Sequence, residues 1–428
     1  MVIKIGFAGK ETSSNTISMP PQPFELFTTL QGARDAVLSV RFSLQARFVS
    51  ATGFNGVNVW SLDSLLPVAL PRKGSLPTKP RYIYPASAWV YFEEHGRHVL
   101  LLGSLEGEIA AWDWNEKRAI FEPARPAVSA GHSKQITSID VSQPSFGGRA
   151  RVAVGHENCQ VSVWKLPLEG SFIKILNVDL GFIPRTVLFD CLTNRIFAFA
   201  MAGSRIVQLS SKSGKITWSS NAVPATIGFA ALHQESERVA LSTGRDLRIY
   251  QLPSCLHLQT MESGPPIVRF PKQVAFTLEG DLLVAGTDAG KAIVYDTRSG
   301  KATQSLKYPR GGLVQSVAAG STRESCYVAV AGSASQQPSD VIIWHRKVPG
   351  AASLKHNNNS EDVNTQDEAV SSFPPPPRRS SALVTLLCVA FGCLAYYHYS
   401  HYPKIQLSPI RIVDIRMAGS VSRETVEN

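Results

Sequence analysis

The stretch Asp281–Leu306 constrains the fold of this chain more than any other part of the sequence. It opens with a short apolar run, Leu282–Ala285, which is typical of a strand buried on both faces. Asp288 and Gly290 then indicate a tight turn, because aspartate accepts local hydrogen bonds and glycine adopts positive φ. Lys291–Asp296 is a second strand, and another turn leads into a third. Three such strands cannot bury both faces alone, so the unit must stack against further copies.

Weaker copies of this unit recur along most of the chain. The units are Val37–Asp63, Ala88–Arg118, Gly131–Leu166, Arg185–Trp218, Ile227–Met261, the opening stretch, and Leu313–Val348. Each has one large side chain in the strand that corresponds to Lys291–Asp296: Trp60, Trp112, Trp164, Leu209, Tyr250, Tyr295 and Trp344. These positions recur every 41 to 52 residues, close to the ~40–45-residue period of propeller blades. Phe24–Leu30 alternates like a strand and stands where a propeller takes its outermost closing strand.

The repeated unit resembles a WD40 repeat. Tyr295-Asp296 stands where that family has its Trp-Asp dipeptide, Trp112-Asp113 is a literal Trp-Asp pair, and Gly131-His132 matches the family's Gly-His dipeptide. The resemblance covers about 320 of the 428 residues. It implies an all-β, seven-bladed WD40-like β-propeller that binds proteins without catalysis. The fourth unit has Leu209 at the tryptophan position, so a ring of six or eight blades is the alternative.

The family's hydrogen-bonded His–Ser/Thr–Asp–Trp network is mostly missing. The third unit keeps His132, Ser162 and Trp164 but has Glu157-Asn158 in place of the aspartate, and the sixth keeps Asp288. In this fold such residues satisfy buried polar groups and close blades. We therefore interpret the repeat positions as structural rather than catalytic: Trp60, Trp112, Asp113, His132, Ser162, Trp164, Tyr250, Asp288, Tyr295, Asp296 and Trp344.

Composition narrows the classes of function. The net charge of +10 and pI of about 9.3 suit nucleic-acid binding, but the basic residues are scattered rather than gathered into a patch or stripe, so we expect none. The six cysteines form no CxxC pair, which indicates isolated thiols in a reducing compartment. The chain contains no GxSxG, HExxH or P-loop motif. We expect no enzyme activity, no cofactor, no metal and no small-molecule substrate.

The ends of the chain differ from its repeated centre. We predict a loose N-terminal segment at 1–23, the propeller at 24–348, a disordered Pro/Ser-rich linker at 349–381, a transmembrane helix at 382–402 and a short tail at 403–428. The linker holds several acids and almost no large apolar residues, which favours disorder. Pro374–Pro377 is interpreted as a stiff spacer, with an SH3 or WW ligand as the alternative.

The segment 382–402 has the length and composition of a membrane span. Its first part, 382–397, is uncharged, and 21 residues of helix measure about 31 Å, enough for a hydrocarbon core of ~30 Å. A buried core helix is the alternative. The short apolar part favours a thin membrane such as that of the ER. Because no signal sequence precedes it, we expect a cytosolic propeller and a lumenal tail.

Two functions follow from this organisation. The first is a membrane-tethered protein–protein interaction scaffold, with contact loops at the insertions Pro71–Tyr84, Gln143–Gly148 and Ser333–Asp340. The alternative is an ER-surface guanine-nucleotide exchange factor for a small GTPase. A WD-repeat propeller with one C-terminal span is similar to the exchange factor that starts COPII coat assembly. That protein's Gly-rich, cation-binding loop has no match here, since Thr52–Gly56 is a plain turn.

Overall fold

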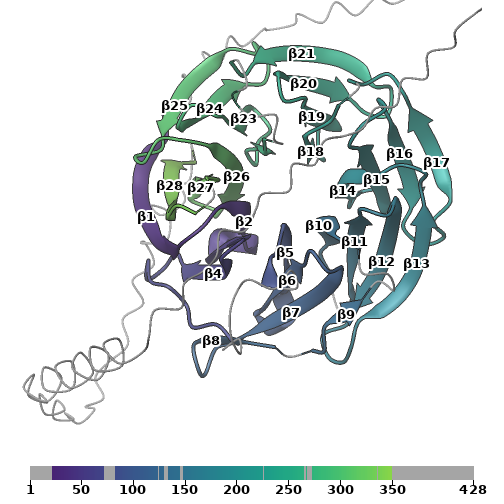
Figure 1. Ribbon diagram of the computed structural model, residues 1–428, viewed down its shortest axis with the longest axis horizontal. Coiled ribbons are helices and arrows are strands. Elements are labelled where there is room, and N and C mark those ends of the chain that lie inside the picture. The colour runs from purple at the N-terminus through teal and green to yellow at the C-terminus, as the bar shows by residue number, and fades with distance from the viewer. Residues whose placement is uncertain are drawn as a thin grey trace, which may run out of the picture. The chain divides into compact units, whose positions relative to one another are not determined.

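Seven antiparallel sheets surround a central channel in the computed structural model of this chain (Figure 1). The structure describes residues 22–348, except 72–81, 124, 130–133, 145–147, 225, 265–266, 268–271 and 335. Each sheet is one blade of a β-propeller, and its first strand lies against the channel. The fold is therefore all-β and seven-bladed, as the repeat spacing predicts. The predicted linker, membrane helix and tail lie outside the described residues.

Within each blade the strands follow one another from the channel outwards. Blade one holds β2 (Val37–Phe42), β3 (Phe48–Gly53) and β4 (Gly56–Ser61); blade two holds β5 (Ala86–Phe92), β6 (Arg97–Gly103), β7 (Glu108–Asn115), β8 (Ile120–Glu122) and β9 (Val128–Ser129). Blade three holds β10 (Ile136–Ser142), β11 (Ala150–His156), β12 (Gln160–Leu166) and β13 (Ile173–Asp179); blade four holds β14 (Pro184–Asp190), β15 (Arg195–Ala200), β16 (Ile206–Ser210) and β17 (Ile216–Ser220). Blade five holds β18 (Phe229–His233), β19 (Arg238–Ser242), β20 (Asp246–Gln251) and β21 (Leu256–Glu262); blade six holds β22 (Val274–Phe276), β23 (Leu282–Gly286), β24 (Lys291–Asp296) and β25 (Ala302–Lys307). Blade seven holds β26 (Val314–Ser321), β27 (Ser325–Gly332), β28 (Ser339–Lys347) and, from the other end of the chain, β1 (Glu25–Ala33); two 3-10 turns, Leu44–Ala46 and Glu93–His95, follow the inner strands of blades one and two.

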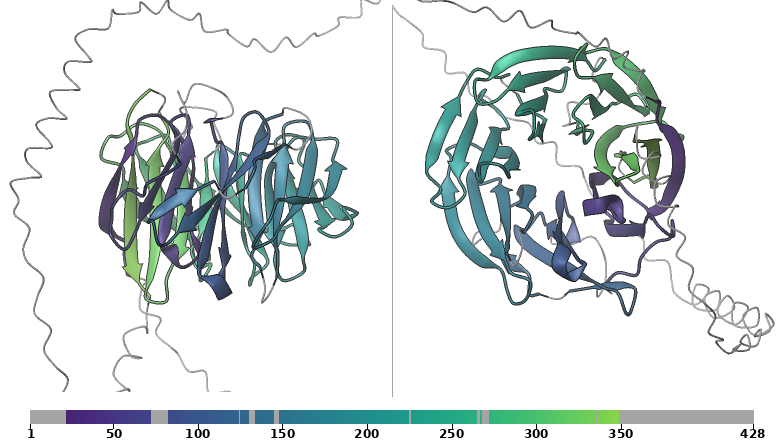
Figure 2. Two further views of the ribbon diagram at one scale, coloured as in Figure 1. Left: turned by 90° about the horizontal axis from the view of Figure 1, so that it is seen from below. Right: turned by 180° about the vertical axis from the view of Figure 1, so that it is seen from behind.

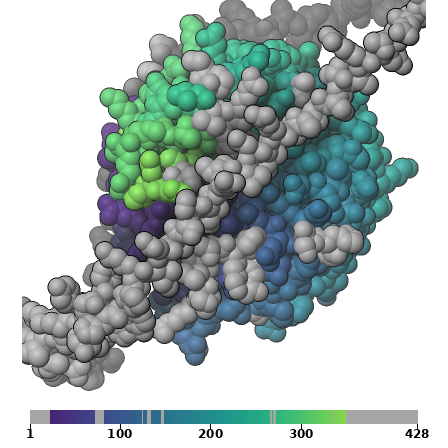
Figure 3. Space-filling view, viewed as in Figure 1, coloured from purple at the N-terminus to yellow at the C-terminus, as the bar shows by residue number. Residues whose placement is uncertain are grey.

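The N-terminal strand closes the ring. β1 pairs antiparallel with β28, with Glu25 opposite His345, Leu30 opposite Val341 and Ala33 opposite Ser339. β1 therefore lies directly against the last blade, purple beside green in Figure 3. This pairing places the first strand of the chain where the sequence predicts a closing strand, and it covers the outer edge of β28, which would otherwise be open to association.

Blades four and one differ from what their sequences predict. The fourth unit, the weakest in sequence, forms a complete four-stranded sheet. Blade one has three strands, and a short irregular segment takes the outer position. In that segment Val68 N donates to Val59 O at 2.8 Å, while Ala69 bridges to Ile120 in the neighbouring blade. The ring thus has seven blades rather than six or eight.

Apolar contact between neighbouring blades forms the core. Blades seven and one share one cluster, with Trp60 against Val341 and Ile343, and a similar cluster fills each of the other six interfaces. Leu209 fills the same place between blades three and four. The large side chain of each unit therefore packs against the preceding blade, which is why a unit cannot fold in isolation.

The ring has two different faces, which Figure 2 shows from the side. We call the end where each inner strand begins the upper face; it carries the turns between second and third strands and the connections between blades. The lower face carries the other turns. β1 begins and β28 ends at the lower face, because Glu25 lies opposite His345. The chain therefore enters and leaves the propeller on the side away from the upper face.

Candidate functional site

The repeat positions lie in the cores between blades. Trp60, Trp112, Trp164, Tyr250 and Tyr295 are at most 5% exposed, and all lie on the third strand of their blades. Trp344 lies on β28 and packs against the core between blades six and seven. Tyr295 also donates its hydroxyl to Glu262 O at 2.7 Å, and burial raises the pKa of this tyrosine to about 12. These side chains hold adjacent blades together and do not face the channel.

Blade three contains a buried polar network around Ser162. Its hydroxyl lies 2.8 Å from His156 Nε2 and accepts a hydrogen bond from Trp164 Nε1 at 2.9 Å. Burial, with a smaller contribution from Lys174, lowers the pKa of His156 to about 4, so the ring is neutral. His132, the histidine singled out in the sequence, lies outside the described residues. His156 was missed because it ends a strand, although Gly155-His156 is itself a Gly-His pair.

Blade six contains a buried ion pair between a lysine and an aspartate. The buried Lys272 Nζ lies 3.0 Å from Asp288 Oδ2, and Asp288 Oδ1 accepts from Gln315 Nε2 at 3.0 Å. Asp288 also accepts from the backbone N–H of Ile267 at 2.9 Å. This carboxylate therefore joins the incoming connection of its own blade to blade seven. An ion pair this deeply buried needs such additional hydrogen bonds to offset the desolvation of both charges.

The two acidic residues of the Trp-Asp positions have local structural roles. Asp113 pairs with Arg97 and lies 3.8 Å from Arg125 Nη2. Arg125 Nη1 and Nη2 donate to backbone carbonyls at Pro167, Gly170 and Leu168, so this cluster ties blade two to blade three. Asp296 instead accepts from the N–H and hydroxyl of Ser299 at 2.6 and 2.7 Å, which stabilises the turn that follows β24.

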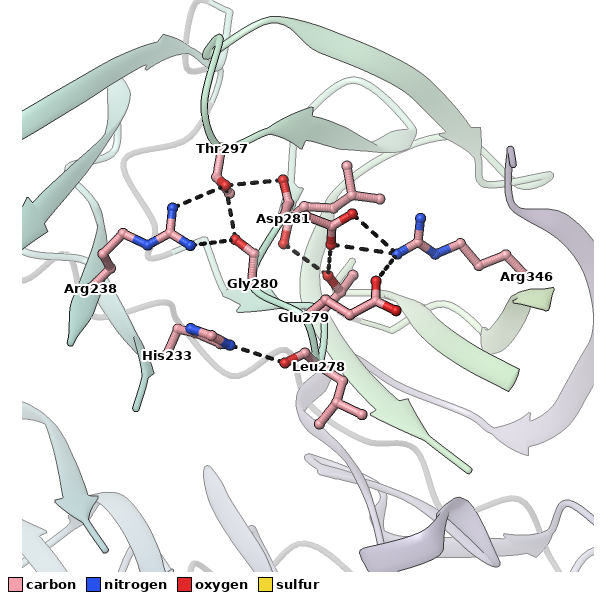
Figure 4. Close-up of polar contacts among 10 residues, drawn as sticks. His233, Arg238, Leu278, Glu279, Gly280, Asp281, Thr297 and Arg346 are labelled. Carbon is pink, nitrogen blue, oxygen red and sulfur yellow. Dashed lines mark hydrogen bonds and ion pairs between the residues drawn. The ribbon is translucent and has the colours of Figure 1, made fainter. Parts of the chain in front are cut away.

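A polar clamp holds the lower turn of blade six (Figure 4). From blade five, His233 Nε2 donates to Leu278 O at 3.0 Å and Arg238 Nη2 donates to Gly280 O at 2.9 Å. From blade seven, Arg346 Nη2 donates to Glu279 Oε2 at 2.7 Å. We call these residues the lower clamp. These residues donate and accept hydrogen bonds among themselves, as expected where polar side chains stabilise the contact between blades.

The upper end of the channel opens as a cavity of about 310 Å³. We call it the channel mouth. All seven blades contribute to it: Leu38, Phe54, Pro85, Leu105, Gln135, Thr137, Arg185, Phe229, Gln273, Gln315 and Ser316. Phe54 is 40% exposed and stands at its rim. Apolar walls with a few polar groups between them are typical of a binding site.

Gln273 of blade six is held at the channel mouth by blades one and seven. Gln273 Nε2 donates to Leu38 O at 2.7 Å, and its Oε1 accepts from Val317 N at 3.3 Å. Arg185 donates from Nε to Gly228 O at 3.0 Å. The polar lining is therefore fixed before any ligand arrives.

A second arginine lies deeper in the channel. The guanidinium carbon of Arg41 is 5.8 Å from the centre of the Phe229 ring, which lines the mouth, whereas Arg41 does not line it. Burial lowers the pKa of Arg41, and Asp140 partly counteracts that shift. Burial also raises the pKa of Asp140 to about 6, although Phe189 N donates to its Oδ2 at 2.6 Å. The deeper cation thus has a carboxylate facing it.

The three insertions proposed as contact loops lie on different faces. Pro71–Tyr84 and Ser333–Asp340 connect strands at the upper face, whereas Gln143–Gly148 is at the lower face. Most of the first insertion lies outside the described residues. Gln143 is not free for a partner, because its side chain bonds to the backbone at Trp89 and Tyr91, each at 2.9 Å. Only the upper insertions adjoin the connections that surround the mouth.

Within the residues that the structure describes, no group of three or more metal-ligating side chains could hold a metal ion. Nor does that part of the chain contain a helix long and apolar enough to cross a membrane. The predicted span, 382–402, falls outside it.

The fold is a seven-bladed β-propeller. No protein-family model matches the chain, and no curated protein matches its sequence. Among solved structures, the β-propeller domain of Cps50 (Swd1) from Myceliophteria thermophila is similar. It is 15% identical, with a TM-score of 0.58 over 75% of this chain and 99% of that chain. At this level of identity the likeness concerns the fold alone.

Proposed function

We propose that this chain is a membrane-tethered protein–protein interaction scaffold that binds its partner with the upper face of the propeller. The channel mouth carries the proposal, because all seven blades converge on one cavity with apolar walls and fixed polar groups. Binding sites in repeat rings form where loops from a rigid scaffold meet. The function is interaction without catalysis.

The tether is the segment 382–402 in an internal membrane, with the propeller in the cytosol. Its 21 residues have the length of a span. The chain leaves the propeller at the lower face, so its connection towards this segment does not start beside the mouth. A carbonate-resistant membrane fraction that is lost on deletion of 382–402 supports the tether. Glycosylation of Asn358 would contradict the cytosolic placement, since that sequon precedes the span.

The upper face is tested by proximity labelling with the full chain in cells. Phe54→Asp places a charge at the rim of the mouth, and Leu278→Asp is the matched change on the lower face, where Leu278 is 64% exposed. We expect Phe54→Asp to lose specific labelled proteins that wild type and Leu278→Asp retain. Equal labelling by all three proteins would rule out the upper face as the binding surface.

A further inference from the structure

The guanidinium of Arg185, at the channel mouth, has hydrogen-bond donors without an acceptor in the described part of the chain. A guanidinium has five N–H donors, and Arg185 uses its Nε, which donates to Gly228 O at 3.0 Å. Its Nη1 and Nη2 atoms make no hydrogen bond and no ion pair with residues of the described ranges. The hydrogen bond to Gly228 joins blade four to blade five and thereby restrains the side chain of Arg185.

Two other cations that join blades of the propeller are satisfied by their neighbours. Lys272 has Asp288 at 3.0 Å. Arg238 has no carboxylate, but its three nitrogens donate to Ser236, Gly280 and Thr297. Each of these two cations therefore meets a carboxylate or several oxygen acceptors, whereas Arg185 meets a single backbone carbonyl among the described residues.

The charge of Arg185 stands in a partly apolar cavity. Burial lowers the pKa of Arg185 with no carboxylate to counteract it, yet an arginine remains protonated at neutral pH. Asp140 faces the deeper Arg41 instead. Phe54 and Phe229 line the same cavity, and apolar walls strengthen an ion pair by excluding water.

We infer that the channel mouth binds the side-chain carboxylate of a glutamate or aspartate in a partner protein, through Nη1 and Nη2 of Arg185. The inference rests on the proposed function. Guanidinium and carboxylate match in a bidentate geometry that an ammonium or amide does not reproduce. Apolar residues beside that acid pack on Phe54 and Phe229. The cavity of about 310 Å³ admits individual side chains rather than a whole element of secondary structure.

The test selects short random peptides by phage display against the full chain in detergent micelles. Enriched peptides are then synthesised with amidated C-termini, so that a side chain is their only carboxylate. We expect a shared Glu or Asp next to apolar residues. Replacing this acid by Gln or Asn weakens binding roughly 30-fold, as expected when one partner of a desolvated charge pair is removed.

Arg185→Met gives the same loss of affinity as the peptide substitution, and the two changes together give no further loss. Arg185→Lys keeps the charge and retains part of the affinity. The matched control is Arg298→Met, because Arg298 is an exposed arginine on the lower face; its affinity stays at the wild-type value. Unfolding of each variant in denaturant shows that the propeller remains intact.

Two results overturn the inference: enriched peptides without an acidic residue, and peptides that bind only when synthesised with a free C-terminal carboxylate. Failure to enrich any peptide also counts against it. These results are separable from the proposed function. If Phe54→Asp loses labelled proteins in cells while the selected peptides lack an acid, the scaffold stands and carboxylate recognition fails.

Discussion

The lower clamp and the channel mouth use the same kinds of residue in opposite ways. In the lower clamp, Arg238 and Arg346 donate to groups on one turn of blade six and leave it fixed between two blades. In the channel mouth, Arg185 is anchored by one hydrogen bond and lines a cavity. The difference teaches that a buried charge alone does not mark a site. What marks it is a guanidinium that lines a cavity and meets no carboxylate and only one carbonyl among the described residues.

We expect the largest loss of stability from a substitution in the lower clamp, at Gly280. This glycine has φ +66°, and a Cβ there would lie 2.6 Å from the His233 ring. Gly280→Ala should lower the free energy of unfolding by about 4 kcal/mol, from backbone strain, overpacking and loss of the His233 hydrogen bond. The control is Gly181→Ala, with the same φ of +66° and no atom within 4 Å; it should cost only about 1 kcal/mol. Denaturant unfolding followed by tryptophan fluorescence measures both, and equal losses would contradict the clash.

Lowering the pH should destabilise the buried polar network of blade three, which the channel mouth does not share. The pKa of His156 is lowered to about 4 in the fold, so its contribution to stability is complete above pH 6.5 and is lost as the pH falls through 4. The loss amounts to about 3 kcal/mol. His156→Gln does not titrate, so its unfolding free energy should fall less than that of wild type between pH 7 and pH 4. Parallel pH profiles for the two proteins would show that His156 is not buried in its neutral form.

Removing one arginine from each region tests the comparison directly. Arg346→Met leaves Glu279 and Asp281 without their partner and should cost about 2 kcal/mol of stability, a value reduced by the partial exposure of both carboxylates. Arg185→Met should cost no more than about 1 kcal/mol of stability, because only one hydrogen bond to a backbone carbonyl is lost. Thermal and denaturant unfolding report both changes. A larger loss for Arg185→Met would make it a structural residue.

The smallest effect concerns two tryptophans. Trp164 Nε1 donates to Ser162 at 2.9 Å, whereas Trp344 Nε1 is buried without a partner among the described residues. Trp164→Phe should therefore cost about 1 kcal/mol more than Trp344→Phe, since both lose similar apolar area but only one loses a hydrogen bond. The denaturant unfolding midpoints of the two variants measure this difference. The same cost at both positions would mean that Trp344 is hydrogen-bonded after all.

The third-strand positions could be predicted because they repeat. Tyr295 and Trp60 occupy the same place in units far apart in sequence, and a repeated unit must bury that place against a neighbour. Even Leu209 fits this pattern, since any large apolar side chain fills an interface between blades. The missing outer strand of blade one was not predictable, because the first unit has a regular sequence and its outer segment turns away to Ile120.

The polar sites could not be read from the chain in the same way. Asp288 was visible as a turn residue, but its partners Lys272 and Gln315 come from a connection and from the next blade. Arg185 looked like the start of one more unit. Nothing near it in sequence shows that Gly228 would accept a hydrogen bond from its side chain or that the residue would line a cavity.

The sequence by itself determined the repeat: the alternation of apolar strands and turns, the large side chain in each unit and the ring that such units must form. Local pattern is sufficient for this, because strand period and turn chemistry act over a few residues. Only the tertiary structure decided which charges are satisfied. Hydrogen bonds between blades join residues tens to hundreds of positions apart, and the ring closure that brings β1 to β28 sets their distances.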